Sequence, residues 1–164
     1  ILFLTSVTVE THRGIEAFGE ASWWAGEAEL EALGPALESK VGELASAEEA
    51  DGEENPLKDA LEGTLEVVRR CRPAPDRLAE GVDLFPLPGV TPGLTGLIVG
   101  EAGRTTVVCG DAVATVEHLS RGMVLAWSSD VEKARESFRE AVEIADVLVL
   151  GRDNAVLNPV QRPF

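Results

Sequence analysis

Four short apolar segments, separated by glycine and proline, follow one another through the middle of the chain. The last three contain the β-branched residues typical of strands, and turn residues end all four before a helical period can develop. Connections this short join strands that run antiparallel. We therefore expect an antiparallel sheet formed by residues 77–79, 82–87, 95–99 and 105–109.

A helical region precedes these strands. Apolar residues recur every three or four positions over residues 27–44, with an interruption at Pro35, and again over residues 56–71. The acidic segment between them, residues 46–55, is expected to form a mobile loop. Because this region lies between strand-like segments, we interpret residues 27–75 as a helical insert in the domain.

Strands and helices also alternate toward both ends of the chain. A capping-box sequence from Ser129 to Glu132 opens a third helix that extends to about Ala145. The remaining expected elements are a strand over residues 1–5, a helical turn over 14–18, and strands over 21–24 and 147–150. Such a mixture predicts an α/β or α+β fold.

Size and charge limit the class of protein and its partners. The chain has 164 residues, 45% of them hydrophobic, which suits a single domain over residues 1–164. Its 29 acidic and 14 basic residues give a net charge of −15, which repels phosphate backbones and anionic lipids. No apolar run approaches the roughly 20 residues that span a bilayer. We expect a soluble, cytoplasmic protein that binds neither nucleic acid nor membrane.

The two cysteines predict neither a zinc site nor a redox motif. Cys71 and Cys109 lie far apart, and neither has a second cysteine or a histidine at ligand spacing. Two buried thiols are the simplest expectation. The sequence leaves open whether they form a disulfide.

Four short motifs occur in order along the chain. They are the loop after Thr5, Thr91-Pro92-Gly93-x-Thr95, Gly110-Asp111-Ala112, and Leu150-Gly151-Arg152. In this order and at these spacings the chain resembles the metallo-β-lactamase superfamily, most closely its glyoxalase II-like branch, where the motifs are THxHxDH, TPGHT, GDA or GDV, and PGH. The resemblance implies an αββα sandwich that holds one or two metal ions and uses them to activate water.

The first motif of this chain lacks the family's histidines. The three histidine positions hold Ser6, Thr8 and Thr11, and the aspartate position holds Glu10. Neutral hydroxyls are weak ligands for zinc or iron. A conventional dinuclear centre is therefore not expected.

The later motifs lead to the same expectation. Leu94 and Arg152 stand at histidine positions, and leucine cannot ligate a metal, while arginine brings a fixed positive charge. Asp111 is retained at the position of the bridging aspartate. We expect Arg152 to form an ion pair with Asp111 that stands in for the charge of the metal.

Two histidines are available for any relocated metal site. His12 follows the first motif and could bind one zinc or iron ion together with Glu10 and Asp111. A solvated or hydrogen-bonded role is favoured for His12 and also for His118.

The leading functional hypothesis is a non-catalytic protein with a metallo-β-lactamase-like fold, serving without a cofactor as a binding or scaffold subunit. One alternative is a divergent hydrolase that uses the relocated metal site. Another is a protein that binds a small anionic ligand through Arg152 in the old active-site cleft.

The resemblance also implies that most of the amino-terminal half of the sandwich is missing. The chain begins with Ile1, inside an apolar run, which indicates a processed chain or a fragment. A strand over residues 1–5 would leave an open edge, and open edges invite association. We therefore expect self-association or a protein partner.

Overall fold

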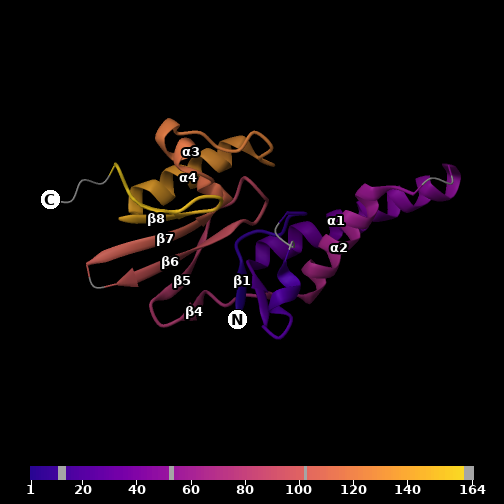
Figure 1. Cartoon of the computed structure of the whole chain (residues 1–164), viewed down its shortest axis with the longest axis horizontal. Helices are drawn as coiled ribbons and strands as arrows, with labels where there is room; N and C mark the ends of the chain where they lie inside the picture. Colours follow the sequence, from indigo (N-terminus) through magenta and orange to yellow (C-terminus); the bar gives the residue numbers. More distant parts are fainter. Residues whose placement is uncertain (11–13, 52–53, 102, 161–164) are drawn as a thin grey trace.

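The computed structural model describes residues 1–10, 14–51, 54–101 and 103–160. Within these ranges the chain forms two β-sheets, and each sheet packs against its own helices (Figure 1). The fold is therefore α+β, as the mixture of elements predicts.

The smaller sheet has three parallel strands in the order β1-β2-β3. Its strands are β1 (Leu2–Leu4), β2 (Trp23–Ala25) and β3 (Arg72–Pro73), and a 3-10 turn, η1 (Ile15–Phe18), lies between the first two. The expected strands at 1–5 and 21–24 and the helical turn at 14–18 are thus confirmed. β1 lies at the edge of this sheet.

Two long helices connect β2 to β3. They are α1 (Glu27–Asp51) and α2 (Pro56–Arg70), and they form a hairpin that extends away from the rest of the molecule (Figure 1). Asn55 caps α2 by accepting a hydrogen bond from the Leu57 amide at 3.0 Å. Because β2 and β3 are parallel, the segment 27–75 leaves one strand of the sheet and returns to its neighbour as a crossover.

The first helix is longer and less interrupted than the sequence predicts. The expected loop at 46–55 is wrong for its first part, because α1 continues to Asp51 with Pro35 inside it. Alanine and glutamate, which dominate this part of the sequence, are strong helix formers. An ion pair of 2.9 Å between Lys58 and Glu48 joins the far end of α1 to α2.

The larger sheet has six strands in the order β4-β5-β6-β7-β8-β9. Its strands are β4 (Arg77–Ala79), β5 (Val82–Pro86), β6 (Thr95–Glu101), β7 (Arg104–Gly110), β8 (Val147–Leu150) and β9 (Ala155–Leu157). The expected antiparallel run from β4 to β7 is confirmed, whereas β7 and β8 are parallel. The sequence predicted neither β3 nor β9.

Helices cover one face of this sheet. They are α3 (Val116–Arg121) and α4 (Val131–Ile144), and the 3-10 turn η2 (Asp111–Val113) precedes them (Figure 1). The core between sheet and helices includes Val107, Cys109 and Leu148, none of which has exposed surface. The expected helix at 129–145 is confirmed.

The cap of α4 differs from the expected capping box. Asp130 is the cap, and its carboxylate accepts a hydrogen bond from the Lys133 amide at 3.0 Å. The hydroxyl of Ser129 instead donates to the carbonyl of Gly89 at 2.9 Å. Ser129 therefore forms a tertiary hydrogen bond and does not cap the helix, which is the role that the sequence suggests.

Candidate functional site

A cleft of about 390 Å³ lies where the ends of three strands meet. The loop after β1 forms one side, and the segments that follow β7 and β8 form the other. The parallel pairing of β7 with β8 brings their carboxyl ends together at this point. The cleft is lined by Thr5, Ser6, Glu10, Val108, Gly110, Asp111, Leu150, Gly151 and Arg152.

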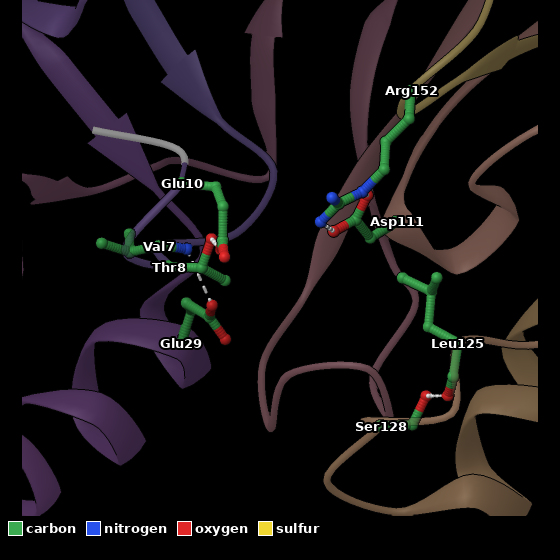
Figure 2. A network of polar contacts seen from close by, with 8 residues as sticks. All are labelled: Val7, Thr8, Glu10, Glu29, Asp111, Leu125, Ser128 and Arg152. Carbon is green, nitrogen blue, oxygen red and sulfur yellow. Dashed lines mark hydrogen bonds and ion pairs between the residues drawn. The ribbon is translucent and has the colours of Figure 1, made fainter. Parts of the chain in front are cut away.

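Asp111 and Arg152 form a two-point ion pair in this cleft (Figure 2). The Nε and Nη2 atoms of Arg152 donate to Oδ1 and Oδ2 of Asp111 at 2.9 and 2.7 Å. The Asp111 side chain is 9% exposed and the Arg152 side chain 41%. The hydrogen bonds to Asp111 raise the pKa of Arg152 above its ordinary value. The expected ion pair is thus confirmed.

Trp127 adds a second contact to this arginine. The guanidinium carbon of Arg152 lies 5.4 Å from the centre of the Trp127 ring, within the range of a cation–π interaction. Arg152 is therefore oriented from two sides. Its planar group is held by a carboxylate and faces an aromatic ring.

Glu10 comes from the other side of the cleft (Figure 2). Its carboxylate accepts a hydrogen bond from the Thr8 hydroxyl at 3.0 Å, and its side chain is exposed. Its negative charge also helps to raise the pKa of Arg152, after the larger effect of Asp111. The cleft thus has one positive group between two negative ones.

Glu29, which belongs to none of the four sequence motifs, connects two loops beside the cleft. Its side chain has no exposed surface and accepts a hydrogen bond from the amide of Val7 at 3.0 Å (Figure 2). It accepts a second one from the amide of Gly93 at 2.9 Å. Burial raises the pKa of Glu29, although these bonds to its carboxylate act in the opposite direction. In the sequence it resembles any acidic residue in the first turn of a helix.

The structure separates the residues that the motifs group together. Ser6, Glu10, Asp111 and Arg152 line the cleft. Leu94 does not, because it is fully buried in the core beneath α4. Thr11 and His12 lie outside the described residues, so the relocated metal site of Glu10, His12 and Asp111 stays a prediction.

The part of the cleft that the structure describes does not fit a dinuclear metal centre. Both oxygens of Asp111 already accept hydrogen bonds from Arg152, and a metal ion would compete with that fixed charge. Within the described ranges, no three histidine, cysteine, aspartate or glutamate side chains are grouped closely enough to hold a metal ion. The remaining polar lining consists mainly of hydroxyls, which bind zinc weakly.

The two cysteines and His118 lie outside the cleft. Cys71 and Cys109 are buried free thiols in different cores, and burial raises the pKa of Cys71 to about 11 and that of Cys109 to about 12. His118 lies in α3, with its Nδ1 atom 2.8 Å from the Thr115 hydroxyl.

None of the described helices has the length and apolar content needed to cross a membrane.

Comparison with solved structures identifies the fold. No protein-family model matches the sequence, and no curated protein matches it either. AidC, a dizinc quorum-quenching lactonase in complex with a product N-hexanoyl-L-homoserine, matches with a TM-score of 0.68 and 14% identity over 98% of this chain and 60% of its own. The chain has a metallo-β-lactamase-like fold.

Two further structures match over most of the chain. The hydrolase AbOPH of the beta lactamase superfamily has a TM-score of 0.62 and 14% identity over 99% of this chain and 64% of its own. B. thuringiensis AiiA, with N-decanoyl-L-homoserine at its active site, has a TM-score of 0.61 and 16% identity over 92% and 54%. The chain thus spans less than two thirds of each protein. Its place in the glyoxalase II-like branch stays a prediction.

Proposed function

We propose that this chain is a non-catalytic protein with a metallo-β-lactamase-like fold, which serves as a binding or scaffold subunit. The ion pair between Arg152 and Asp111 carries the proposal, because it lies where the motifs place ligands of the metal. An internal cation in the form of a guanidinium offsets the charge of the carboxylate. The loops can then keep their arrangement without a bound metal.

The proposal also rests on the chemistry of the groups that remain. Activation of water at neutral pH needs a metal or a general base held near the reacting atom. Asp111 is committed to Arg152, and Glu10 is exposed and accepts a hydrogen bond from Thr8. Of the two carboxylates that line the cleft, Asp111 is therefore not arranged to take a proton from a water.

Metal content and hydrolysis test the proposal together. The protein is purified without chelator and its zinc, iron and manganese are measured by mass spectrometry. It is then assayed with N-acyl homoserine lactones, with and without added zinc. We expect far less than one metal ion per chain and hydrolysis at the buffer rate. A stoichiometric metal, or hydrolysis that needs one, would overturn the proposal.

A divergent hydrolase is the second candidate, and the observation that favours it is that the matched structures include a dizinc lactonase and a hydrolase. In that case one metal would bind Glu10, His12 and Asp111. Glu10→Gln and His12→Gln would each abolish metal binding, whereas His118→Gln, far along the chain from the first motif, would leave it unchanged. Metal binding that resists the first two substitutions would exclude this site.

A further inference from the structure

Glu29 ties together the two loops that meet beside the cleft. We call residues 5–10, which follow β1, the first loop, and residues 87–94, which join β5 to β6, the second loop. The Oε1 atom of Glu29 accepts a hydrogen bond from the Val7 amide of the first loop (Figure 2). Its Oε2 atom accepts one from the Gly93 amide of the second loop. A single side chain therefore joins segments that lie far apart in the sequence.

The first loop is also one wall of the cleft. Its residues Thr5, Ser6 and Glu10 line the cleft. The amide of Thr95 donates a hydrogen bond of 2.8 Å to the carbonyl of Thr5, which fixes the beginning of the loop to β6. Glu29 holds the part of the loop that follows. A change at Glu29 can therefore move this wall while the fold around it stays intact.

The Glu29 side chain is buried without a positive charge to offset its own. It has no exposed surface, and among the described residues no basic side chain contributes to its pKa. The second loop carries no charged residue at all. The charged residues nearest in the sequence of the first loop and of α1 are Glu10, Glu27 and Glu31, which are acidic and exposed. Burial of a carboxyl in such surroundings favours its neutral form.

Hydrogen bonds oppose the effect of burial but do not outweigh it. The two amides favour the ionised form of Glu29, and so does the hydroxyl of Thr91. That hydroxyl is buried in the second loop and lies outside hydrogen-bond geometry to any described group. Burial is the largest effect, and it raises the pKa of Glu29 above the ordinary value. The two loops in contact thus bind the proton of Glu29 more tightly than water-exposed loops would.

An equilibrium between closed and open loops must therefore depend on pH. When the first loop moves away from the second, Glu29 meets water and regains the ordinary pKa of a glutamate, about 4.3. Acid favours the closed arrangement, because that arrangement holds the proton more tightly. Once Glu29 is ionised, the open arrangement gains about tenfold in relative population for each pH unit that separates the closed pKa from the open one.

We propose that Glu29 is a proton-dependent latch, which holds the first loop against the second while its proton is bound and loosens one wall of the cleft when the proton is lost. The latch goes beyond the proposed function and acts whether or not the cleft is catalytic. Glu29 already has no exposed surface within the described residues, so the latch does not require any surface of the chain to stay uncovered.

Hydrogen exchange of single amides, followed by NMR from about pH 4 to about pH 8, tests the latch. The amides of Val7 and Gly93 can exchange when the latch opens. After correction for the intrinsic effect of pH on exchange, their protection should fall as Glu29 loses its proton. The midpoint of the fall should match the pKa of Glu29 measured from its carboxyl carbon resonance. Glu29→Gln cannot ionise, so protection in this variant should stay constant over the same range.

A reference amide separates opening of the loop from unfolding of the whole chain. Val107 lies in the core strand β7 and has no exposed surface, so its amide reports global unfolding. We expect the amides of Val7 and Gly93 to exchange faster than that of Val107 at every pH.

A second variant covers the case in which Glu29→Gln disturbs the fold. The Thr91 hydroxyl lowers the pKa of Glu29, so Thr91→Val should raise that pKa and move the fall in protection to higher pH. Thr64→Val is the matched control. Its hydroxyl is also buried, but it donates to the carbonyl of Ala60 within α2, and its loss should leave the midpoint in place.

Three results would overturn the latch. Protection of Val7 and Gly93 that is constant or rises with pH would show that loss of the proton does not open the loops. Exchange no faster than that of Val107 would mean that the first loop does not open on its own. An equal fall in Glu29→Gln, or an equal shift of the midpoint in Thr64→Val, would show that Glu29 does not control the change.

Discussion

At the scale of single residues, substitutions of Arg152 and Asp111 test how much their ion pair contributes to the free energy of unfolding. Arg152→Ala leaves a nearly buried carboxylate without its cation, which should lower the free energy of unfolding by about 1–3 kcal/mol. Asp111→Ala and the variant that carries both substitutions complete a double-mutant cycle. Because Arg152 is partly exposed, we expect a coupling energy of about 1 kcal/mol from urea unfolding.

The exposed pair of Glu117 and Arg121 is the control for this cycle. Its atoms lie 3.1 Å apart, and both side chains are more than 60% exposed. Exposed pairs four residues apart in a helix contribute about 0.3–0.5 kcal/mol. If both cycles give the same small coupling, the pair in the cleft contributes no more than a surface contact.

The raised pKa of the buried Glu29 predicts that the free energy of unfolding depends on pH. Since burial raises its pKa, the folded state holds the proton more tightly than the unfolded state. The contribution of Glu29 to stability is therefore complete below the unfolded pKa of about 4.3 and is lost as the pH rises through the folded pKa. Glu29→Gln cannot titrate. The stability of the native sequence relative to Glu29→Gln should fall as the pH rises above about 4.3.

Urea unfolding at a series of pH values measures this difference. Glu31→Gln, at an exposed position of the same helix, should give a curve parallel to that of the native sequence. If the curve of Glu29→Gln is also parallel, Glu29 keeps an ordinary pKa in the fold and this account of it is wrong.

At the scale of elements, the glycines of the motifs hold segments close together. A side chain on Gly93 would place its Cβ 2.0 Å from the amide nitrogen of Glu29, at the start of α1. One on Gly151 would come within 2.5 Å of the carbonyl of Gly110, where the end of β8 meets the end of β7. These glycines therefore have packing roles that are independent of any metal.

Gly93→Ala tests this role. The methyl group must displace the backbone of α1 and should lower the free energy of unfolding by about 1–3 kcal/mol. Gly42, within α1, would place its Cβ in open space. Gly42→Ala should therefore raise the free energy of unfolding by about 0.5–1 kcal/mol. Thermal or urea unfolding of both variants gives the sign of each effect, and a stabilising Gly93→Ala would contradict the close packing.

At the scale of the whole molecule, charge repulsion opposes the compact state. A net charge of −15 on a chain of 164 residues should make the melting temperature rise as salt increases from about 0.01 to about 1 M, because salt screens repulsion between exposed charges. The control is the same series near the isoelectric point of about 4.4, where the net charge is small. If the melting temperature rises equally at both pH values, the rise is a general effect of salt and does not come from the net charge.

The sequence by itself determined most of the helices and strands, and it also predicted which two residues form the ion pair in the cleft. Short apolar segments predicted β1, and segments ended by glycine or proline predicted the strands β4 to β8, because the period of a strand and the residues of a turn are local properties. The motif order predicted that Arg152 meets Asp111, which it does. The strands depend on residues that are neighbours in the sequence, and the ion pair was predicted from the order of the four motifs along the chain.

Only the tertiary structure decided which of the motif residues share a site. Leu94 lies within the second motif but is buried in the core beneath α4, while Glu29, in a helix far from any motif in the sequence, joins two of the loops. A strand's pattern tells that two faces exist, but burial depends on what lies over each face, and that is a property of the packed molecule.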